Sequence, residues 1–125
     1  MSLLLIGLGG LIGAIARFQI VKFVNTSYSI TLLSVPIKPG IMLVNILGSV
    51  LLGIITALVQ KLEISEDLKN LITVGFLGSL TTFSTFSLEI YELLKQNNFQ
   101  SVILYVLLSV ILSILGLFFG FKIFS

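Results

Sequence analysis

The sequence has 125 residues, of which 57% are hydrophobic and only 10% are charged. Its mean hydropathy is +1.21. A soluble domain of this size would leave about a third of its unfolded surface in water, so it could not hide this much apolar surface. The composition therefore excludes an ordinary soluble protein and predicts an all-α membrane protein.

The residue types that are missing exclude further classes of function. The chain has no cysteine and no histidine. Disulfide and thiol chemistry are therefore excluded, and the usual proton carrier near neutral pH is absent. The net charge is only +2 and no basic run is present, so nucleic acid is not an expected partner.

Four apolar segments follow one another along the chain. A hydrocarbon core of ~30 Å needs ~20 helical residues, and each segment is long enough to cross it. Pro39 suits the first turn of the second helix, and Ser65 is a candidate N-cap ahead of the third. We therefore expect one domain, residues 1–125. Its predicted transmembrane helices cover residues 3–24, 39–60, 69–94 and 99–122.

The seven lysines and arginines are shared evenly between the two sides of such a membrane domain. One side would carry Lys61, Lys69, Lys122 and the terminal amine. The other side would carry Arg17, Lys22, Lys38 and Lys95. A balance of four against four gives no preferred orientation under the positive-inside rule. The chain could insert in both orientations, or a few decisive residues or a partner could still set one.

Residues 81–87, TTFSTFS, place five hydroxyl groups and two phenylalanines inside the third apolar segment. Polar groups without partners are costly in hydrocarbon, so this cluster should face protein, water or an ion. Gly78 and the threonines weaken the helix, and we expect a break near residues 78–81. Backbone carbonyls freed there would be good ligands for a hard cation such as Na⁺.

The aromatic and hydroxyl members of this cluster have competing interpretations. Phe83 and Phe86 are three residues apart and can share a helix face, where a ring edge with positive partial charge could meet an anion. The alternative is that both rings pack as ordinary core. Ser84 and Thr85 are assigned to the same path as candidate donors, although they could instead hold the break in place.

Polar residues in the second and fourth segments could face the same path. Asn45 could donate to an anion or make a structural hydrogen bond between helices. Ser101, Tyr105, Ser109 and Ser113 follow one another at four-residue spacing, so they lie along one helical face. A stripe of four hydroxyls favours a polar track for a solute, although a single serine can bond its own backbone.

Two charged side chains adjoin these apolar segments. Arg17 could be a snorkelling anchor, or it could attract anions into a vestibule. Glu89 follows the hydroxyl cluster and could be a helix-end charge or guard an ion exit. Small residues also recur at four-residue spacing, which indicates close helix packing within or between subunits. These pairs are Gly9 with Gly13, Ser49 with Gly53, and Gly116 with Gly120.

Three motifs resemble those of the small bacterial fluoride channel family, Fluc, also called CrcB. Residues 9–18 (GGLIGAIARF) are similar to its first-helix motif, and residues 40–49 (GIMLVNILGS) to its Gly-Thr-Leu-x-Val-Asn-x-x-Gly motif. Residues 75–87 (GFLGSLTTFSTFS) resemble its signature third helix. The sequence departs from the family pattern at Phe18, Ile41 and Ser79, where tyrosine, threonine and glycine are common.

The resemblance implies an antiparallel dual-topology dimer with two fluoride pores in the inner membrane of a bacterium. It implies a structural Na⁺ held by main-chain oxygens at the broken third helix, where Gly78 and Thr81 match. Arg17 matches a vestibule residue. The residues that match the fluoride pore are Asn45, Phe83, Phe86, Glu89, Tyr105, Ser109 and Ser113.

The expected function is therefore passive, fluoride-selective export that lowers cytoplasmic fluoride, without enzymatic activity. The expected partners are fluoride, membrane lipid and a second copy of the chain. A small multidrug transporter is the first alternative, but it would need a carboxylate in mid-membrane and usually tryptophan. A non-transporting scaffold subunit is the second, and it would leave the polar positions without a common path.

Overall fold

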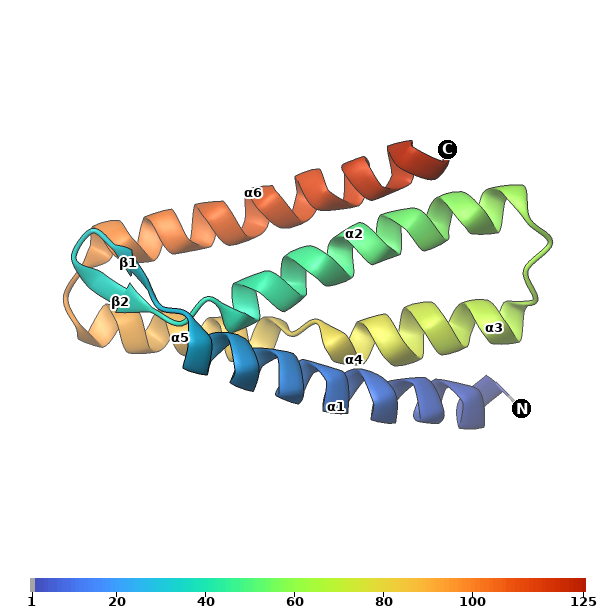
Figure 1. Ribbon diagram of the computed structural model, residues 1–125, viewed down its shortest axis with the longest axis horizontal. Helices are drawn as coiled ribbons and strands as arrows, with labels where there is room; N and C mark the ends of the chain where they lie inside the picture. The colour runs from blue at the N-terminus through green and yellow to red at the C-terminus, as the bar shows by residue number, and fades with distance from the viewer. Residues whose placement is uncertain (1) are drawn as a thin grey trace.

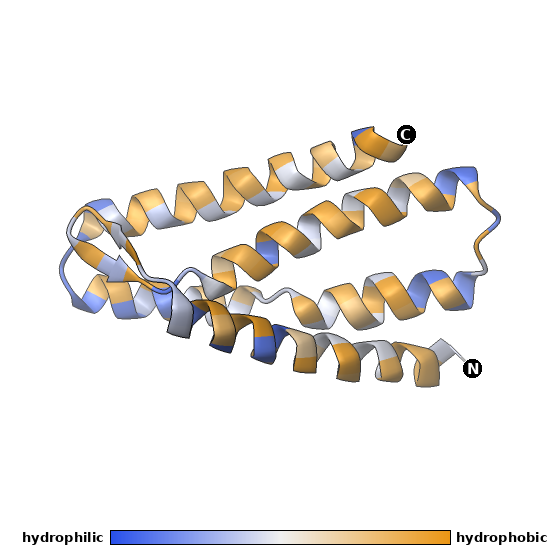
Figure 2. Cartoon of the chain, in the orientation of Figure 1, coloured by the Kyte–Doolittle hydropathy of each residue, from blue (hydrophilic) through white to orange (hydrophobic). Residues whose placement is uncertain are grey.

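The computed structural model describes residues 2–125 and is dominated by four long helical segments (Figure 1). Each segment is long and apolar enough to cross a membrane, which confirms the prediction of a four-span membrane protein. Hydrophobic residues run along the segments, and hydrophilic residues gather at their connections (Figure 2). The three continuous helices are α1 (Ser2–Ser27), α2 (Gly40–Lys61) and α6 (Phe99–Phe124).

The third segment is assembled from consecutive pieces. It consists of α3 (Glu66–Asn70), the π-helix η1 (Leu71–Leu77), α4 (Gly78–Leu80) and α5 (Phe83–Lys95). Thr81 and Thr82 lie between α4 and α5 with extended backbones, at φ −85° and ψ 156° and at φ −152° and ψ 125°. We call Thr81 and Thr82 the interruption. Ser65 caps α3 as predicted, since its hydroxyl accepts from the Leu68 N–H at 3.4 Å.

The prediction of an all-α protein is wrong in the connection between α1 and α2. Strands β1 (Ile30–Leu32) and β2 (Val35–Ile37) pair there as an antiparallel hairpin. Its two turn residues, Leu33 and Ser34, have positive φ angles of 48° and 72°. Glycine, asparagine and aspartate normally occupy such positions, so the sequence carried no hairpin signal.

Hydrogen bonds to the start of α6 hold the hairpin in place. The Ser101 hydroxyl donates to the Leu32 carbonyl at 2.8 Å, and the Asn98 amide donates to the Leu33 carbonyl at 3.2 Å. Apolar residues of β2 then pack with Phe86 and Tyr105 in the main buried cluster. Tertiary contacts therefore determine a turn that local sequence does not favour.

The small residues allow the helix backbones to approach one another within the chain. A Cβ atom on Gly53 would collide with the Leu117 carbonyl of α6, and one on Gly120 would collide with the Val50 carbonyl of α2. On α1, a Cβ atom on Gly9 would collide with the Leu71 carbonyl of η1. Packing within the subunit therefore accounts for these glycines.

Both chain termini lie at the same end of the bundle, together with the α2–α3 connection (Figure 1). The hairpin and the α5–α6 turn lie at the opposite end. Pro39 directly precedes α2 rather than occupying its first turn, and its carbonyl accepts from the Leu43 N–H at 2.9 Å. This arrangement brings the interruption alongside α2 and α6 in the middle of the bundle.

Candidate functional site

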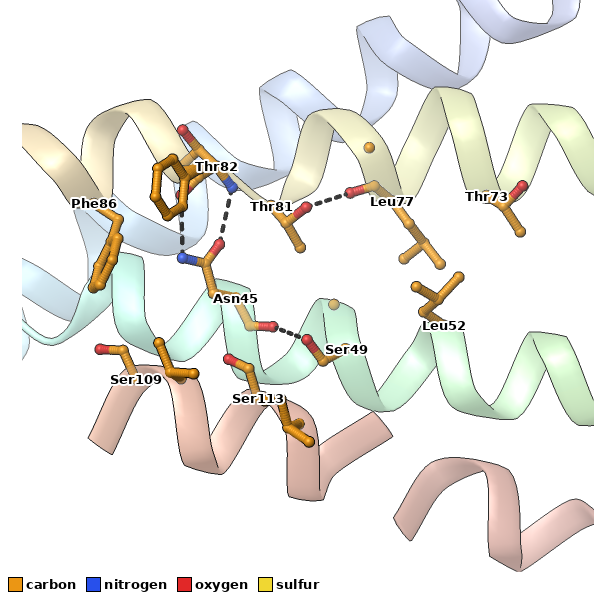
Figure 3. A pocket seen from close by; sticks show the side chains of 15 residues that line it. Asn45, Ser49, Leu52, Thr73, Leu77, Thr81, Thr82, Phe86, Ser109 and Ser113 are labelled. Atoms are coloured by element: carbon orange, nitrogen blue, oxygen red, sulfur yellow. Dashed lines mark hydrogen bonds between the residues drawn. The ribbon is translucent and has the colours of Figure 1, made fainter. Parts of the chain in front are cut away.

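A cavity of about 400 Å³ lies beside the interruption, between α2, the third segment and α6 (Figure 3). It mixes hydroxyl, amide and apolar side chains. Polar side chains in a membrane-spanning bundle need protein, water or a solute as a partner, so lipid alone would be an unfavourable neighbour. The lining residues are Asn45, Gly48, Ser49, Leu52, Thr73, Leu77, Gly78, Thr81, Thr82, Phe83, Phe86, Ser109, Val110, Ser113 and Ile114.

The Asn45 side chain pairs with the backbone of the interruption (Figure 3). Its Oδ1 accepts from the Thr82 N–H at 2.9 Å, and its Nδ2 donates to the Thr82 carbonyl at 3.1 Å. One amide therefore replaces the two helical hydrogen bonds that this residue would otherwise make. Of the two interpretations of Asn45, the structural hydrogen bond is present, and one Nδ2 hydrogen is left to face the cavity.

The hydroxyl groups after the interruption bond to one another and to backbone. Thr82 is the N-cap of α5, because its Oγ1 accepts from the Thr85 N–H at 3.2 Å. The same oxygen lies 3.2 Å from the hydroxyls of Ser84 and Thr85. Ser84 and Thr85 do not line the cavity. This network supports their interpretation as residues that hold the interruption.

The wall formed by α2, η1 and the interruption presents hydroxyl groups whose protons are already donated. Ser49 donates to the Asn45 carbonyl at 2.8 Å, Thr73 to the Lys69 carbonyl at 2.9 Å, and Thr81 to the Leu77 carbonyl at 3.0 Å. Each hydroxyl donates to the carbonyl four residues earlier in the chain. These three hydroxyls offer the cavity lone pairs, which suit water or a cation better than an anion.

The opposite wall contains a hydroxyl group that is free to donate. Ser109 is only 4% exposed, and its Oγ makes no hydrogen bond of acceptable geometry to any residue that the structure describes. The neighbouring Tyr105 hydroxyl donates its proton to the Glu89 carboxylate. A buried hydroxyl without a partner is unusual and indicates a ligand or water that would complete its bonding. Ser113 lines the cavity one helical turn beyond Ser109.

Three aromatic rings lead from the cavity toward Glu89. The Phe83 and Phe86 centroids are 5.7 Å apart, which confirms that the two rings share a face. Phe86 and Tyr105 are 5.6 Å apart. Phe86 is 6% exposed, whereas Phe83 is 79% exposed. Tyr105 and Glu89 lie beyond Phe86 and do not line the cavity, so the predicted site residues form a row with the cavity at one end.

Arg17 is half-buried against the interruption. Its Nη1 donates to the Thr81 carbonyl at 3.3 Å. It also lines a second, separate cleft with Thr85. The structure therefore ties this cation to the third segment, in addition to any role it has as an anchor or in a vestibule.

The backbone oxygens of Gly78 and Thr81 suit a hard cation in kind. Gly78 is exposed, and the Thr82 N–H that would bond its carbonyl in a continuous helix bonds Asn45 instead. The Thr81 carbonyl leaves the helix and accepts from Arg17. Two oxygens do not surround a cation, so these residues of one chain do not form a complete cation site by themselves.

Three hydroxyl residues that line the cavity, Ser49, Thr73 and Thr82, were not among the site residues predicted from the sequence. Thr73 passed as an ordinary member of an apolar segment, and Ser49 was noted only for its small size. Thr82 caps α5 and pairs with Asn45, although the sequence alone assigns it no specific role. Threonine is one of the residue types preferred at an N-cap, which is the one local signal that was available.

The fold and this cavity together define a small multi-pass helical membrane protein with an interrupted third span. The family model described as "CrcB-like protein, Camphor Resistance (CrcB)" matches residues 4–121, so the chain belongs to this family.

Several curated relatives are similar to the chain over nearly its whole length, and each is named "Fluoride-specific ion channel FluC". A relative from Campylobacter jejuni (strain 81116) is 40% identical over 99% of this chain and 98% of its own length. A relative from Shewanella baltica (strain OS185) is 44% identical over 95% of this chain and 92% of its own length. One from Francisella philomiragia is 39% identical over 95% and 91%.

Proposed function

We propose that this protein is a fluoride-selective ion channel, rather than an enzyme, that passively exports F⁻ and lowers cytoplasmic fluoride. The observation that carries the proposal is the buried, unpartnered hydroxyl of Ser109 on the wall of the cavity. The names of the relatives support the choice of ion.

The arrangement of donors suits a small anion. Fluoride binds its water tightly, so a pore must replace that hydration with well-placed donors. Ser109 and Ser113 provide hydroxyls, Asn45 provides its remaining amide hydrogen, and Phe83 and Phe86 provide ring edges. Tyr105 and Glu89 continue the row toward the hairpin end, so we assign all seven residues to the fluoride path.

Passive conduction accounts for export. Moving one elementary charge across a membrane changes its free energy by about 2.3 kcal/mol for each 100 mV of membrane potential. With the cell interior negative, this energy favours F⁻ outside by roughly 40-fold. We propose the inner membrane of a bacterial cell as the location, where this potential is present.

We further propose that two copies assemble as an antiparallel, dual-topology dimer. A cavity with this many polar groups needs a protein cover in the membrane, and the exposed ring of Phe83 lies at its edge. The balance of four positive charges against four gives neither orientation an advantage. The domain, residues 1–125, would serve as one half of the assembly.

A structural Na⁺ would bind where the two interruptions meet. Gly78 and Thr81 of each copy would contribute backbone oxygens, and the ion would hold the two third segments together. Its positive charge would also partly offset the negative charge of anions nearby. Arg17 would lie close to this ion through the Thr81 carbonyl and would add positive potential to a vestibule.

Efflux from liposomes tests the function. Purified protein should release F⁻ from loaded vesicles and release Cl⁻ far more slowly. Phe86→Ile should slow F⁻ efflux by up to about tenfold, since one aromatic contact is worth up to ~1.5 kcal/mol. Leu88→Ile, on an exposed part of the same helix, is the control. Equal release of F⁻ and Cl⁻ would contradict the proposal.

A further inference from the structure

The β1–β2 hairpin packs against two of the residues assigned to the fluoride path. Strand β2 alternates between buried and exposed side chains, so that Val35 and Ile37 are buried and Pro36 between them is exposed. Val35 and Ile37 belong to the same buried cluster as Phe86 and Tyr105. The inner face of the hairpin therefore meets the path at the pair of rings that leads away from the cavity.

The Phe86 ring depends on packing for its position. Its centroid lies 5.6 Å from that of Tyr105 and 5.7 Å from that of Phe83, which is exposed. The Tyr105 ring is tethered through its hydroxyl, which donates to Glu89. The Phe86 side chain has no polar atom, so its neighbours alone decide which rotamer it adopts and where its ring edge points.

The hairpin does not hold itself in place. An isolated hairpin of two short strands is at best marginally stable. The turn residues Leu33 and Ser34 weaken it further, because residues of these types disfavour their positive φ angles of 48° and 72°. The position of the hairpin must therefore be fixed by contacts outside its two strands.

Ser101 provides the most deeply buried polar contact to the hairpin. Its side chain is fully buried, and its hydroxyl donates to the carbonyl of Leu32, the last residue of β1, at 2.8 Å. Asn98 donates to the Leu33 carbonyl at 3.2 Å, and its Oδ1 accepts from the Ser101 N–H at 3.1 Å. The start of α6 thus holds the hairpin where the chain enters its turn.

We propose that the hairpin holds the Phe86 and Tyr105 rings in the position that fluoride requires, and that Ser101 is the positioning residue that fixes the hairpin. This inference rests on the proposed function, because it concerns how the fluoride path keeps its shape. Ser101 is the first of the four hydroxyl residues at four-residue spacing on α6, yet it does not line the cavity. Its proton is donated to the hairpin, so it supports the path from outside.

Single-channel recording of the purified full chain in planar bilayers tests the proposal. Ser101→Ala removes the donor to the Leu32 carbonyl and should lower the unitary F⁻ conductance by about twofold to tenfold, the range that loss of one neutral hydrogen bond can produce. A loss of folded protein would lower the number of channels but not the current through each one. An unchanged unitary conductance would overturn the proposal.

A change of the turn residues provides a rescue. Leu33 and Ser34 are exposed, so Leu33→Asn with Ser34→Gly removes little packing and introduces residues that adopt positive φ readily. Combined with Ser101→Ala, this pair should restore most of the unitary conductance. Failure to restore it would mean that Ser101 does not act through the hairpin.

Two further variants grade the effect. Asn98→Ser keeps an N-cap acceptor for α6 but removes the amide that reaches the Leu33 carbonyl, so it should lower the unitary conductance less than Ser101→Ala does. Thr56→Ala is the matched control, because this exposed hydroxyl donates to the Leu52 carbonyl of its own helix. A loss of conductance in Thr56→Ala equal to that in Ser101→Ala would contradict a specific role of the hairpin.

The position of the ring can also be measured without conduction. With 4-fluorophenylalanine in place of Phe86, the ¹⁹F NMR resonance should shift or broaden in Ser101→Ala and stay unchanged in Thr56→Ala. A wild type that conducts no F⁻ would contradict the proposed function. A conducting wild type whose ¹⁹F resonance is unaffected by Ser101→Ala would instead overturn the positioning role and leave the proposed function intact.

Discussion

Residues 81–87 and the buried face of α6 both place hydroxyl groups inside a membrane domain, but they use them differently. In residues 81–87, the hydroxyls of Thr81, Thr82 and Ser87 bond backbone groups, and Ser84 and Thr85 bond Thr82. On α6, Ser109 is buried without a partner. The hydroxyls of residues 81–87 therefore satisfy their hydrogen bonding within the protein, whereas that of Ser109 does not.

This comparison teaches that the density of polar residues does not identify the group that meets a solute. A hydroxyl whose proton is donated to its own helix stabilises the backbone and presents only lone pairs. A buried hydroxyl that lacks a partner retains a donor and has an energetic reason to bind a ligand. The hydrogen bonds therefore identify the buried face of α6 as the region with a free donor, although composition alone would favour residues 81–87.

The largest expected effect concerns the amide that serves the interruption. Asn45→Leu would leave the Thr82 N–H and carbonyl without partners, at about 1–3 kcal/mol for each group. We expect a loss of about 2–5 kcal/mol in the free energy of unfolding, measured by denaturant titration in detergent with circular dichroism. Fluoride efflux should fall as well, because Asn45 lines the cavity.

Thr56→Val is the control for Asn45→Leu. Thr56 is exposed on the same helix and bonds only the Leu52 carbonyl, at 2.7 Å. Its replacement should change the free energy of unfolding by less than ~0.5 kcal/mol. A stable Asn45→Leu variant would mean that the interruption does not depend on this amide.

The second prediction compares the Ser109 hydroxyl, which makes no hydrogen bond, with the Ser49 hydroxyl, which donates to its own helix. Ser109→Ala removes a buried group without a partner, so the fold should be unchanged or more stable by up to ~1–3 kcal/mol. Fluoride efflux should nevertheless fall, by about tenfold for a lost hydrogen bond of ~1.5 kcal/mol. The measurements are chemical unfolding and liposome efflux on the same preparation.

Ser49→Ala is the matched variant on the opposite wall of the cavity. The Ser49 proton is donated to the Asn45 carbonyl, so efflux should change by less than about twofold. Similar efflux in the Ser109 and Ser49 variants would remove the distinction between the two walls.

The smallest effect is expected within residues 81–87. Thr82→Ala removes the N-cap of α5 and should lower the free energy of unfolding by about 1 kcal/mol, measured as a shift in the thermal midpoint. Ser87→Ala removes an exposed hydroxyl that bonds the Phe83 carbonyl and should change it by less than ~0.5 kcal/mol. Equally small effects of the two variants would mean that capping at Thr82 is unimportant.

The four spans could be predicted from the sequence because hydropathy and length determine which segments can cross a membrane. The four-residue spacing on α6 also predicted a shared face, and Ser101, Tyr105 and Ser109 are all buried. Their roles could not be predicted, because each role depends on a partner far away in the sequence. The Ser101 hydroxyl donates to the Leu32 carbonyl of the hairpin, and the Tyr105 hydroxyl donates to Glu89. The Ser109 hydroxyl makes no such bond to the residues that the structure describes.

The hairpin and the pairing of Asn45 with Thr82 were out of reach for the same reason. Leu33 and Ser34 adopt positive φ angles that their own chemistry does not favour, and contacts with residues 98–101 compensate for that. An asparagine in an apolar helix signals a needed partner but does not say which one. Local hydropathy therefore predicts the transmembrane spans, whereas hydrogen bonds between distant residues determine the structure of the cavity.

The π-helix η1 gives the third span a different angular phase from that of a uniform helix. Its hydrogen bonds span five residues rather than four, so each such turn accommodates an additional residue. Gly75 can thereby lie against the backbone of α1 while Thr73 and Leu77 line the cavity. Deleting one residue of η1 would rotate everything that follows by ~100°. The π-helix thus determines which side of the third span faces α2, and it places the interruption next to Asn45.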